Sequence, residues 1–506
     1  MRKLFRVAFA AAIAAAGTPV GAAWHEAKSK HFIINGDVDA QTLGDYAKKL
    51  ERFDQAVRMA RGMTDPPLTD AERLKIFFVR SPNEWQDLTG GGGFLGGYIP
   101  RASGSYAFVP KMKGDAQGDF NSDILFFHEY AHHLMFQNWA APLPTWFVEG
   151  FAEFLSTAKI NDDGSVILGS AANHRAYAVH ALSHDLPLTA MLRGTDKGLT
   201  GWKLEIIYSR GWLLMHYLTF EPSRRGQLDR YIAGIQNGQD ALESAKAAFG
   251  DLRQLDDELE RYSTSKEISG VLIRPDPAKI GTISVRALGG GEAALMPIHM
   301  RSDFGVTTKF ARILAGRARK LAEPYPSDAF AQATLAEAEY DAKHYAAAEA
   351  AADRALAADP NSVRALIYKG RAEMELAKTK PAADWKQVRS WFAKANRLET
   401  ENAEPLMLYY QSFVAAGERP TDAATKGLLY AMVLAPQDHK LRWMAVRQLL
   451  LERKLEEAKH ALVPIAYDPH AGGDRDRADQ VLTAIESGDS TKGVTLIEAL
   501  QREWED

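Results

Sequence analysis

Residues 128–132 read His128-Glu129-Tyr130-Ala131-His132, and this stretch decides how the first half of the chain is interpreted. Histidines four residues apart lie on one face of an α-helix, so both imidazoles can point at the same place. Glu129 is turned by about 100° from His128, which leaves its carboxylate beside that place. The flanking residues favour a helix, because polar helix-capping residues precede an apolar stripe that runs to Phe136 without glycine or proline.

A second predicted helix supplies a further carboxylate. Residues 142–145 are typical of a turn that ends in a helix cap, and the helix from Trp146 onward carries Glu149, seventeen positions after His132. Two histidines and a glutamate form a ligand set of catalytic zinc, with a fourth position open for water. We therefore expect one Zn²⁺ on His128, His132 and Glu149, and Glu129 as the general base that takes a proton from water.

Glu153 lies four residues after Glu149 and hence on the same helix face. It is the alternative third ligand. With Glu149 on the metal, Glu153 suits another role, in which it accepts a hydrogen bond from Nδ1 of a ligand histidine and fixes the tautomer of that ring.

The composition excludes several kinds of site. The 506 residues include no cysteine, which rules out disulfides, thiol catalysis and cysteine-bound metals. The net charge is −4, and no basic stripe favours a nucleic-acid partner. A chain of this length is expected to form about two or three domains.

The N-terminus has the pattern of an export signal. A basic start, an alanine-rich apolar stretch and small residues at Gly21-Ala22-Ala23 predict a signal peptide over residues 1–23. We expect an exported protein, in the periplasm of a bacterium or secreted, with no stable membrane insertion after cleavage.

Strand and helix patterns predict an α+β domain over 24–265. Strands at 31–34 and 74–79 flank a helix at about 39–62, which implies a small mixed sheet beside the metal helix, the predicted helix that carries His128 and His132. Residues 105–110 form a further strand, either an edge that pairs with an extended substrate or a purely structural strand. The glycine-rich stretch at 89–98 lacks the lysine of a phosphate loop and is interpreted as a mobile loop. Short apolar runs over 266–305, including 294–299, predict a small β connector.

The rest of the chain repeats. Pro326 and Pro360 lie 34 residues apart and Pro436 and Pro469 lie 33 apart, with an insertion at 378–385 between these units. Apolar and small residues between the prolines occupy tetratricopeptide-repeat positions, with Gly370 where two helices would cross closely. We expect an all-α solenoid of about four or five repeats over 306–485, then a tail at 486–506. Its concave surface would suit a protein partner.

The first half resembles the gluzincin metallopeptidases, specifically bacterial peptidase MA-like proteins that are distantly related to aminopeptidase N. The resemblance covers about 24–265 and rests on residues 128–132, Glu149-Gly150-Phe151-Ala152 and Tyr208-Ser209-Arg210-Gly211. It implies a zincin-like fold and a tyrosine, Tyr208, that hydrogen-bonds the oxyanion of the transition state. Arg210 stands where the aminopeptidases have lysine.

The chain differs from the aminopeptidases in two respects, which limit the activity that the resemblance implies. Sixteen residues, 133–148, separate the second histidine from Glu149, whereas the aminopeptidases usually have eighteen. The chain also lacks the Gly-x-Met-Glu-Asn segment that holds a substrate's free amine, and residues 104–107 contain no acid. The sequence therefore favours an endopeptidase over an aminopeptidase. Hydrolysis of a non-peptide bond, or a scaffold with a non-catalytic metal domain, remain the alternatives.

Overall fold

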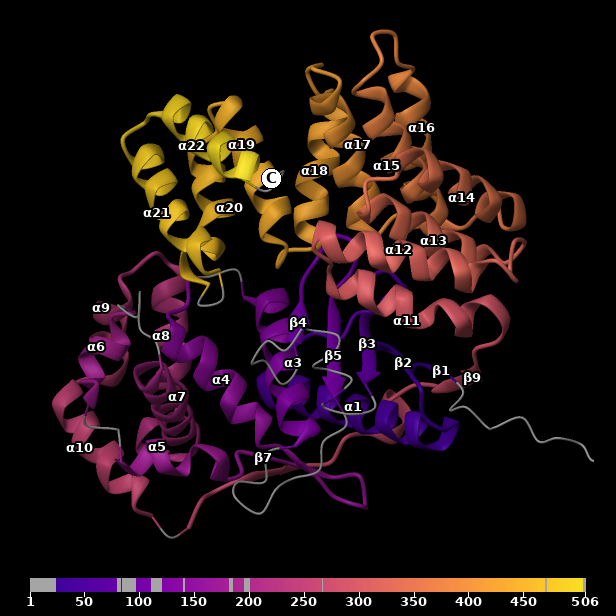
Figure 1. Ribbon diagram of the computed structural model, residues 1–506. Coiled ribbons are helices and arrows are strands. Elements are labelled where there is room, and N and C mark those ends of the chain that lie inside the picture. The colour runs from indigo at the N-terminus through magenta and orange to yellow at the C-terminus, as the bar shows by residue number, and fades with distance from the viewer. Residues whose placement is uncertain are drawn as a thin grey trace, which may run out of the picture.

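The computed structural model describes residues 24–79, 83, 97–110, 121–139, 142–181, 185–194, 201–265, 267–468 and 471–503. The signal segment at 1–23 and the glycine-rich residues 89–96 lie outside the described residues. Figure 1 shows an N-terminal part of mixed strands and helices, in indigo to magenta, and a helical part, in orange to yellow, that arches over it. Within the described residues, no helix is long and apolar enough to cross a membrane.

The N-terminal part combines two sheets with helices. Its strands are β1 (His25–Lys28), β2 (Phe32–Gly36), β3 (Leu74–Val79), β4 (Gly97–Ile99), β5 (Tyr106–Pro110), β6 (Lys159–Ile160), β7 (Val166–Leu168), β8 (Val271–Ile273) and β9 (Ser284–Ala287). Its helices are α1 (Ala40–Arg61), α3 (Ser122–Asn138), α4 (Thr145–Ser156), α5 (Ala176–Ala181), α6 (Leu188–Leu192), α7 (Trp202–Phe220), α8 (Gln227–Gln236), α9 (Ala241–Phe249) and α10 (Leu252–Ser263), with short 3₁₀ turns η1 (Asn173–Arg175), η3 (Pro222–Arg224) and η4 (Pro277–Lys279).

The larger sheet is mixed, as predicted. Its order is β4-β5-β3-β2-β1-β9, with β2, β3 and β5 parallel and the other neighbours antiparallel. The predicted strands at 31–34 and 74–79 are found as β2 and β3, and the helix at 39–62 as α1. The order corrects one expectation: β5 lies between β3 and β4, so residues 105–110 are not an edge, and the outer strand beside the metal helix is β4.

Both faces of this sheet are covered, which explains why β3 is an almost continuous apolar run. Ile34 and Ile76 pack on one face against apolar residues of α1 and α3. Phe77 and Phe108 lie on the other face, in one cluster with Met296 and nearby apolar residues. Met296 belongs to the first helix of the helical part, so the two halves of the chain share a core.

The helical part consists of helices that pack in successive pairs. They are α11 (Gly290–Phe304), α12 (Thr308–Ala322), α13 (Ala329–Asp341), α14 (Tyr345–Ala358), α15 (Val363–Ala377), α16 (Trp385–Leu398), α17 (Ala403–Ala415), α18 (Asp422–Leu434), α19 (His439–Leu451), α20 (Leu455–Tyr467), α21 (Gly473–Glu486) and α22 (Ser490–Glu503). A Cβ on Gly370 would lie 2.6 Å from the ring of Phe392, so this glycine does permit the close crossing of α15 and α16.

The solenoid is longer than the sequence predicts. It starts at residue 290 rather than 306, and the expected tail at 486–506 contains α22, with Ile497 and Leu500 buried against neighbouring helices. Six helix pairs are present in the described residues, against about four or five expected repeats.

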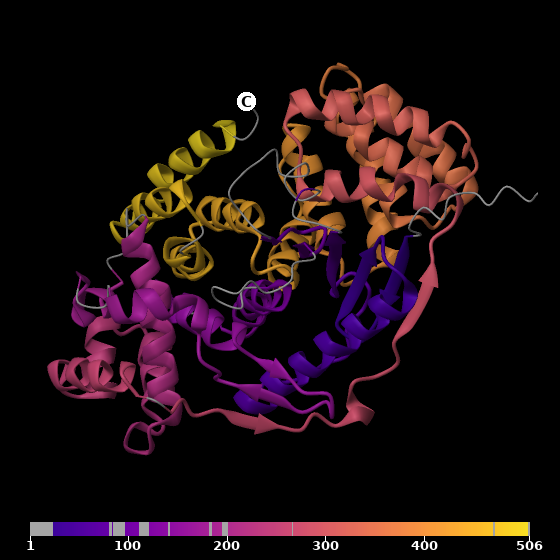
Figure 2. The same cartoon turned by 60° about the horizontal axis from the view of Figure 1, so that its bottom comes forward.

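Residues 266–305 do not form a separate β connector. β8 pairs with β7 and β9 pairs with β1, so both strands complete the sheets of the N-terminal part. In Figure 2 this segment runs along the outside of that part before it enters the solenoid. The run 294–299 is helical, within α11. It has the composition of a buried strand because α11 is covered on two sides: Leu295 packs against α12 and α13, and Met296 against the sheet.

The turn between β4 and β5 docks into the solenoid. The Ala102 amide donates to Asp438 Oδ2 at 2.7 Å, and its side chain, 5% exposed, belongs to an apolar cluster of α17, α18 and α19. Arg101 donates to the Phe304 carbonyl at 3.2 Å. β4 thus contacts the metal helix α3 on one side and leads directly into the solenoid on the other.

Candidate metal centre

Helix α3 carries the two histidines and is held firmly at its base. Asn121 caps its first turn by accepting from the amides of Asp123 and Ile124. The Tyr130 hydroxyl donates to buried Asp54 of α1 at 2.7 Å, which ties α3 to the core. The opposite face of the helix is therefore left to His128 and His132.

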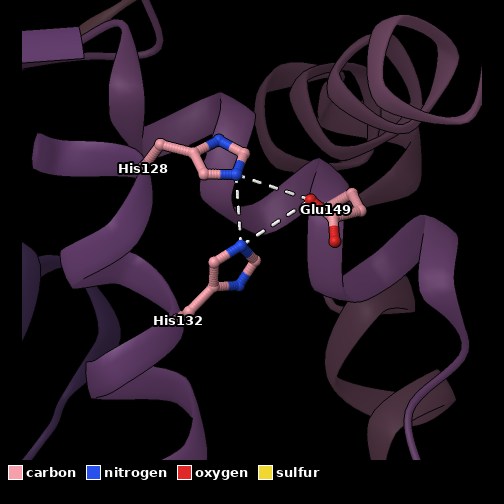
Figure 3. A group of neighbouring side chains, drawn as sticks. All are labelled: His128, His132 and Glu149. Atoms are coloured by element: carbon pink, nitrogen blue, oxygen red, sulfur yellow. Dashed lines mark hydrogen bonds and ion pairs between the residues drawn. The ribbon is translucent and has the colours of Figure 1, made fainter. Parts of the chain in front are cut away.

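Helix α4 brings the third donor. It packs against α3, as expected, and every one of its residues is buried, Glu149 completely so. Nε2 of His128 lies 3.1 Å from Nε2 of His132, and Glu149 Oε2 lies 3.5 Å and 3.6 Å from these two nitrogens. Figure 3 shows the three side chains converging from the two helices on one point.

These separations suit a zinc ion. Ligand atoms about 2.0–2.1 Å from a tetrahedral ion lie about 3.3–3.4 Å from one another. The three observed edges, 3.1, 3.5 and 3.6 Å, surround that value. Two imidazoles and one carboxylate are also the donor types that zinc prefers, so His128, His132 and Glu149 fit the group that the sequence predicts.

Glu129 is half-buried and follows His128 on α3. Burial raises the pKa of Tyr98, on β4, and the negative charge of Glu129 contributes to that rise. The Glu129 carboxylate therefore influences Tyr98 electrostatically, and α3 contacts β4.

Glu153 lies behind the predicted ligands, in the position expected from its spacing. Its Oε1 is 3.2 Å from Nδ1 of His128, the ring nitrogen that faces away from the other donors. Its Oε2 accepts from Nε2 of His174 at 2.9 Å, and its Oε1 also accepts from Arg175 at 2.7 Å. The carboxylate thus contacts one predicted ligand and two residues of η1.

Charge dominates the protonation of this cluster. Burial alone would lower the pKa of His128, but the carboxylates of Glu149 and Glu153 outweigh burial and raise it to about 10 in the metal-free site. Burial would likewise raise the pKa of Glu153, yet its hydrogen bonds to the histidines and the charge of Arg175 hold it well below its usual range. Glu153 is therefore an anion at neutral pH.

Tyr208 reaches the site because α4 and α7 cross closely. A Cβ on Gly150 would lie 2.6 Å from the Gly211 carbonyl oxygen, so neither helix could approach as closely with a larger residue. The Tyr208 ring stacks on that of His128, with centroids 6.0 Å apart and planes at 16°. Burial and the charge of Glu149 raise the pKa of Tyr208 well above its usual value, which keeps its phenol protonated.

Arg210 points away from the metal donors. Its guanidinium donates to the Leu186 carbonyl and to Asp256 of α10. Arg210 therefore fastens α7 to its neighbours.

Three residues that surround Glu153 and Tyr208 could not be predicted from the sequence. His174 and Arg175 belong to η1, and Glu205 to the first turn of α7, where it accepts from Arg175 at 2.6 Å. A three-residue turn has no periodicity, so only the three-dimensional structure brings these side chains to the site.

Two other clusters of histidine and acids occur in the described residues, and each already contains its own cation. In the group of His31, Glu51 and Asp54, the Asp54 carboxylate accepts from Arg58 at 2.8 Å. In the group of His299, Asp303 and Glu337, Arg364 donates to Asp303 at 3.0 Å and to Glu337. An arginine thus already pairs with acidic residues of each cluster.

The comparisons with known proteins bear on the helical repeat. No protein-family model matches this chain, and neither does any curated protein. Similar solved structures include a thermophilic tetratricopeptide-repeat protein of Thermus thermophilus, with 17% identity, 38% of this chain and 97% of that chain covered, and a TM-score of 0.33. PilF of Pseudomonas aeruginosa has 17% identity, 42% of this chain and 92% of that chain covered, and a TM-score of 0.32. These TM-scores are too low to support an argument, so the evidence for a helical repeat is the pairing of successive helices in this structure.

Proposed function

We propose that this chain is an exported zinc-dependent hydrolase, most simply a metallopeptidase of the gluzincin type. One observation carries the proposal: Nε2 of His128, Nε2 of His132 and Glu149 Oε2 converge with the edge lengths of a tetrahedral zinc site. Export is inferred from the signal pattern of residues 1–23.

The residues around the donors fit peptide hydrolysis. When bound, zinc supplies Lewis acidity that polarises a carbonyl group and acidifies water. Glu129 accepts the proton of the attacking water and passes it to the leaving amine. Tyr208, kept protonated by burial and by the charge of Glu149, donates a hydrogen bond to the oxyanion that develops in the transition state.

The surrounding fold favours an extended substrate. β4 is the outer strand of the sheet, lies against α3 and has one unpaired edge among the described residues, to which a peptide backbone can add. Residues 104–107, with no carboxylate, belong to the turn and the start of β5. Nothing there would hold a free amine, so an endopeptidase is preferred.

Chelator-sensitive cleavage of a mixed peptide library tests the proposal. The native protein is expected to cleave members of the library, to stop when a chelator removes the metal, and to recover with added zinc. His132→Ala should bind no zinc and cleave nothing. Absence of chelator-sensitive cleavage from all peptides would contradict the peptidase assignment.

A second candidate function is a scaffold that binds a protein partner on the solenoid and uses the metal domain as a structural unit. Its support is the stack of helix pairs over residues 290–503, which presents a long surface of the kind that repeat proteins use for binding. Nothing in the comparisons favours a peptidase over this scaffold. Stable capture of a partner by a zinc-loaded protein that cleaves no peptide would favour it.

A further inference from the structure

Arg175 connects two parts of the metal centre. Its two terminal nitrogens donate to different carboxylates: one to Glu153 Oε1 at 2.7 Å, the other to Glu205 Oε2 at 2.6 Å. The face of its guanidinium lies over Tyr208, 4.9 Å from the ring centroid. One side chain, 20% exposed, therefore contacts the helices α4 and α7 at once.

We propose that Arg175 is a positioning residue. It fixes the orientation of the His128 ring, through Glu153, and the orientation of the Tyr208 ring. The part that concerns His128 requires only that this residue binds a metal ion. The part that concerns Tyr208 rests on the proposed hydrolase function. Arg175 lies outside the sequence motifs that contain the predicted site residues.

One oxygen atom links Arg175 to His128. Glu153 Oε1 accepts from Arg175 and is also the oxygen 3.2 Å from Nδ1 of His128. His174 contacts the other oxygen, Oε2. Arg175 therefore restrains the atom that orients the His128 ring, whereas His174 alone would let the carboxylate turn about its remaining contact. A carboxylate that accepts from a metal-bound histidine affects metal affinity or activity by about 10- to 100-fold, and Glu153 is such a carboxylate. Arg175 acts on it from one step further out, so the effect of losing Arg175 lies at the lower end of that range.

Arg175 also contacts the ring of Tyr208. Tyr208 is stacked on His128 on one side and contacts Arg175 as well, which restricts rotation of the ring. The ion pair of Arg175 with Glu205, one turn before Tyr208 on α7, holds the arginine in this orientation. Lysine could keep one of these contacts but not all three, because its single ammonium lacks the planar fork that serves two carboxylates and an aromatic face together.

Zinc affinity of the full-length protein tests the proposal without any substrate. We expect Arg175→Met, which keeps the aliphatic stem, to weaken zinc binding by about tenfold in competition with a chromogenic chelator, the lower end of the effect of losing the carboxylate itself. Arg175→Lys should restore part of the loss. Arg224→Met is the matched control, because Arg224 is a buried arginine of the same domain whose partners, Glu258 and the Phe249 carbonyl, do not touch the metal centre. It should lower thermal stability and leave zinc affinity unchanged.

A spectrum separates positioning from general destabilisation. The visible absorption of the cobalt-loaded protein reports ligand geometry, so it should change in Arg175→Met, move back toward the native spectrum in Arg175→Lys and stay native in Arg224→Met. Native affinity and a native spectrum in Arg175→Met would overturn the proposal. If that variant does not fold, the same result in Arg175→Lys overturns it. A native protein that binds zinc but cleaves no peptide would contradict the peptidase function alone.

Discussion

At the scale of single residues, His128 can bind either a proton or a metal ion. Glu149 and Glu153 favour its protonated form in the absence of metal, whereas a metal ligand must offer a free lone pair. The raised pKa means that protonation stabilises the metal-free fold, fully below pH about 6.5 and progressively less as pH rises through about 10. Metal and proton therefore compete for this ring.

Zinc binding to the metal-free protein at pH 7 is expected to release about one proton from His128. Isothermal titration calorimetry in buffers with different ionisation enthalpies measures this number from the slope of the observed enthalpy. The apparent affinity should increase about tenfold per pH unit between pH 7 and 9. An observed enthalpy that is the same in all buffers would contradict the competition. His132→Ala, which lacks one donor, is the control for weak binding elsewhere.

The arrangement of the candidate residues could be predicted where the information is local. His128, His132, Glu149 and Glu153 lie on two adjacent helices, so helical spacing predicts that their side chains come together, as they do in the structure. The residues that hold Glu153, His174 and Arg175, come from a turn that no short-range pattern relates to α4. Tyr208 was found only through a family resemblance, because its contact with His128 depends on how α7 crosses α4.

At the scale of elements, that crossing decides whether the centre is complete. Gly150 and Gly211 meet backbone to backbone: a Cβ on Gly211 would lie 2.8 Å from the Trp146 carbonyl oxygen. Backbone atoms of two buried helices cannot give way as a flexible side chain can. The glycines therefore allow α7 to bring Tyr208 to the metal donors.

Gly150→Ala should force α4 and α7 apart, lower the free energy of unfolding by about 1–3 kcal/mol and weaken zinc binding, since Glu149 precedes the altered position. Thermal unfolding and chelator competition measure the two effects. Gly316→Ala is the control, because this α12 glycine has no neighbour within 4 Å of the added Cβ. It should stabilise the protein by up to about 1 kcal/mol. An unchanged melting temperature in Gly150→Ala would contradict the close crossing.

Strand pairing between distant segments explains the element-level errors. β9 pairs with β1 across some 260 residues, as in the contact of Arg286 with Glu26, so a short apolar run gives no sign of its partner. Helix α11 was predicted as a strand because Pro297 and three glycines, 289–291, interrupt its helical pattern. Tertiary packing on two sides outweighs those local preferences.

At the scale of the whole molecule, the solenoid and the N-terminal part share a core. α11 closes one face of the sheet, and the turn after β4 inserts Ala102 among α17, α18 and α19. On the same hairpin, the Tyr98 hydroxyl lies 2.8 Å from Nδ1 of His133, next to a predicted ligand. The two halves should therefore unfold together.

Ala102→Glu places a carboxylate in an apolar cluster beside Asp438 and should undock the turn from the solenoid. We expect faster limited proteolysis within residues 97–105 and a second unfolding transition in calorimetry. Ala350→Glu adds the same charge to an exposed position of α14 and should change neither. A single, native-like transition in Ala102→Glu would show that this contact does not join the halves.

The measurement that tests the central claim most directly compares the native protein with Glu129→Gln, each loaded with one zinc per chain, on the same peptide library. The variant keeps all three donor atoms and loses only the proton acceptor. We predict equal zinc content and cleavage by the native protein alone, with turnover of the variant lowered by about 10²-fold or more. Equal cleavage by both proteins, or none by the native protein, would contradict the assignment of this centre as that of a zinc metallopeptidase.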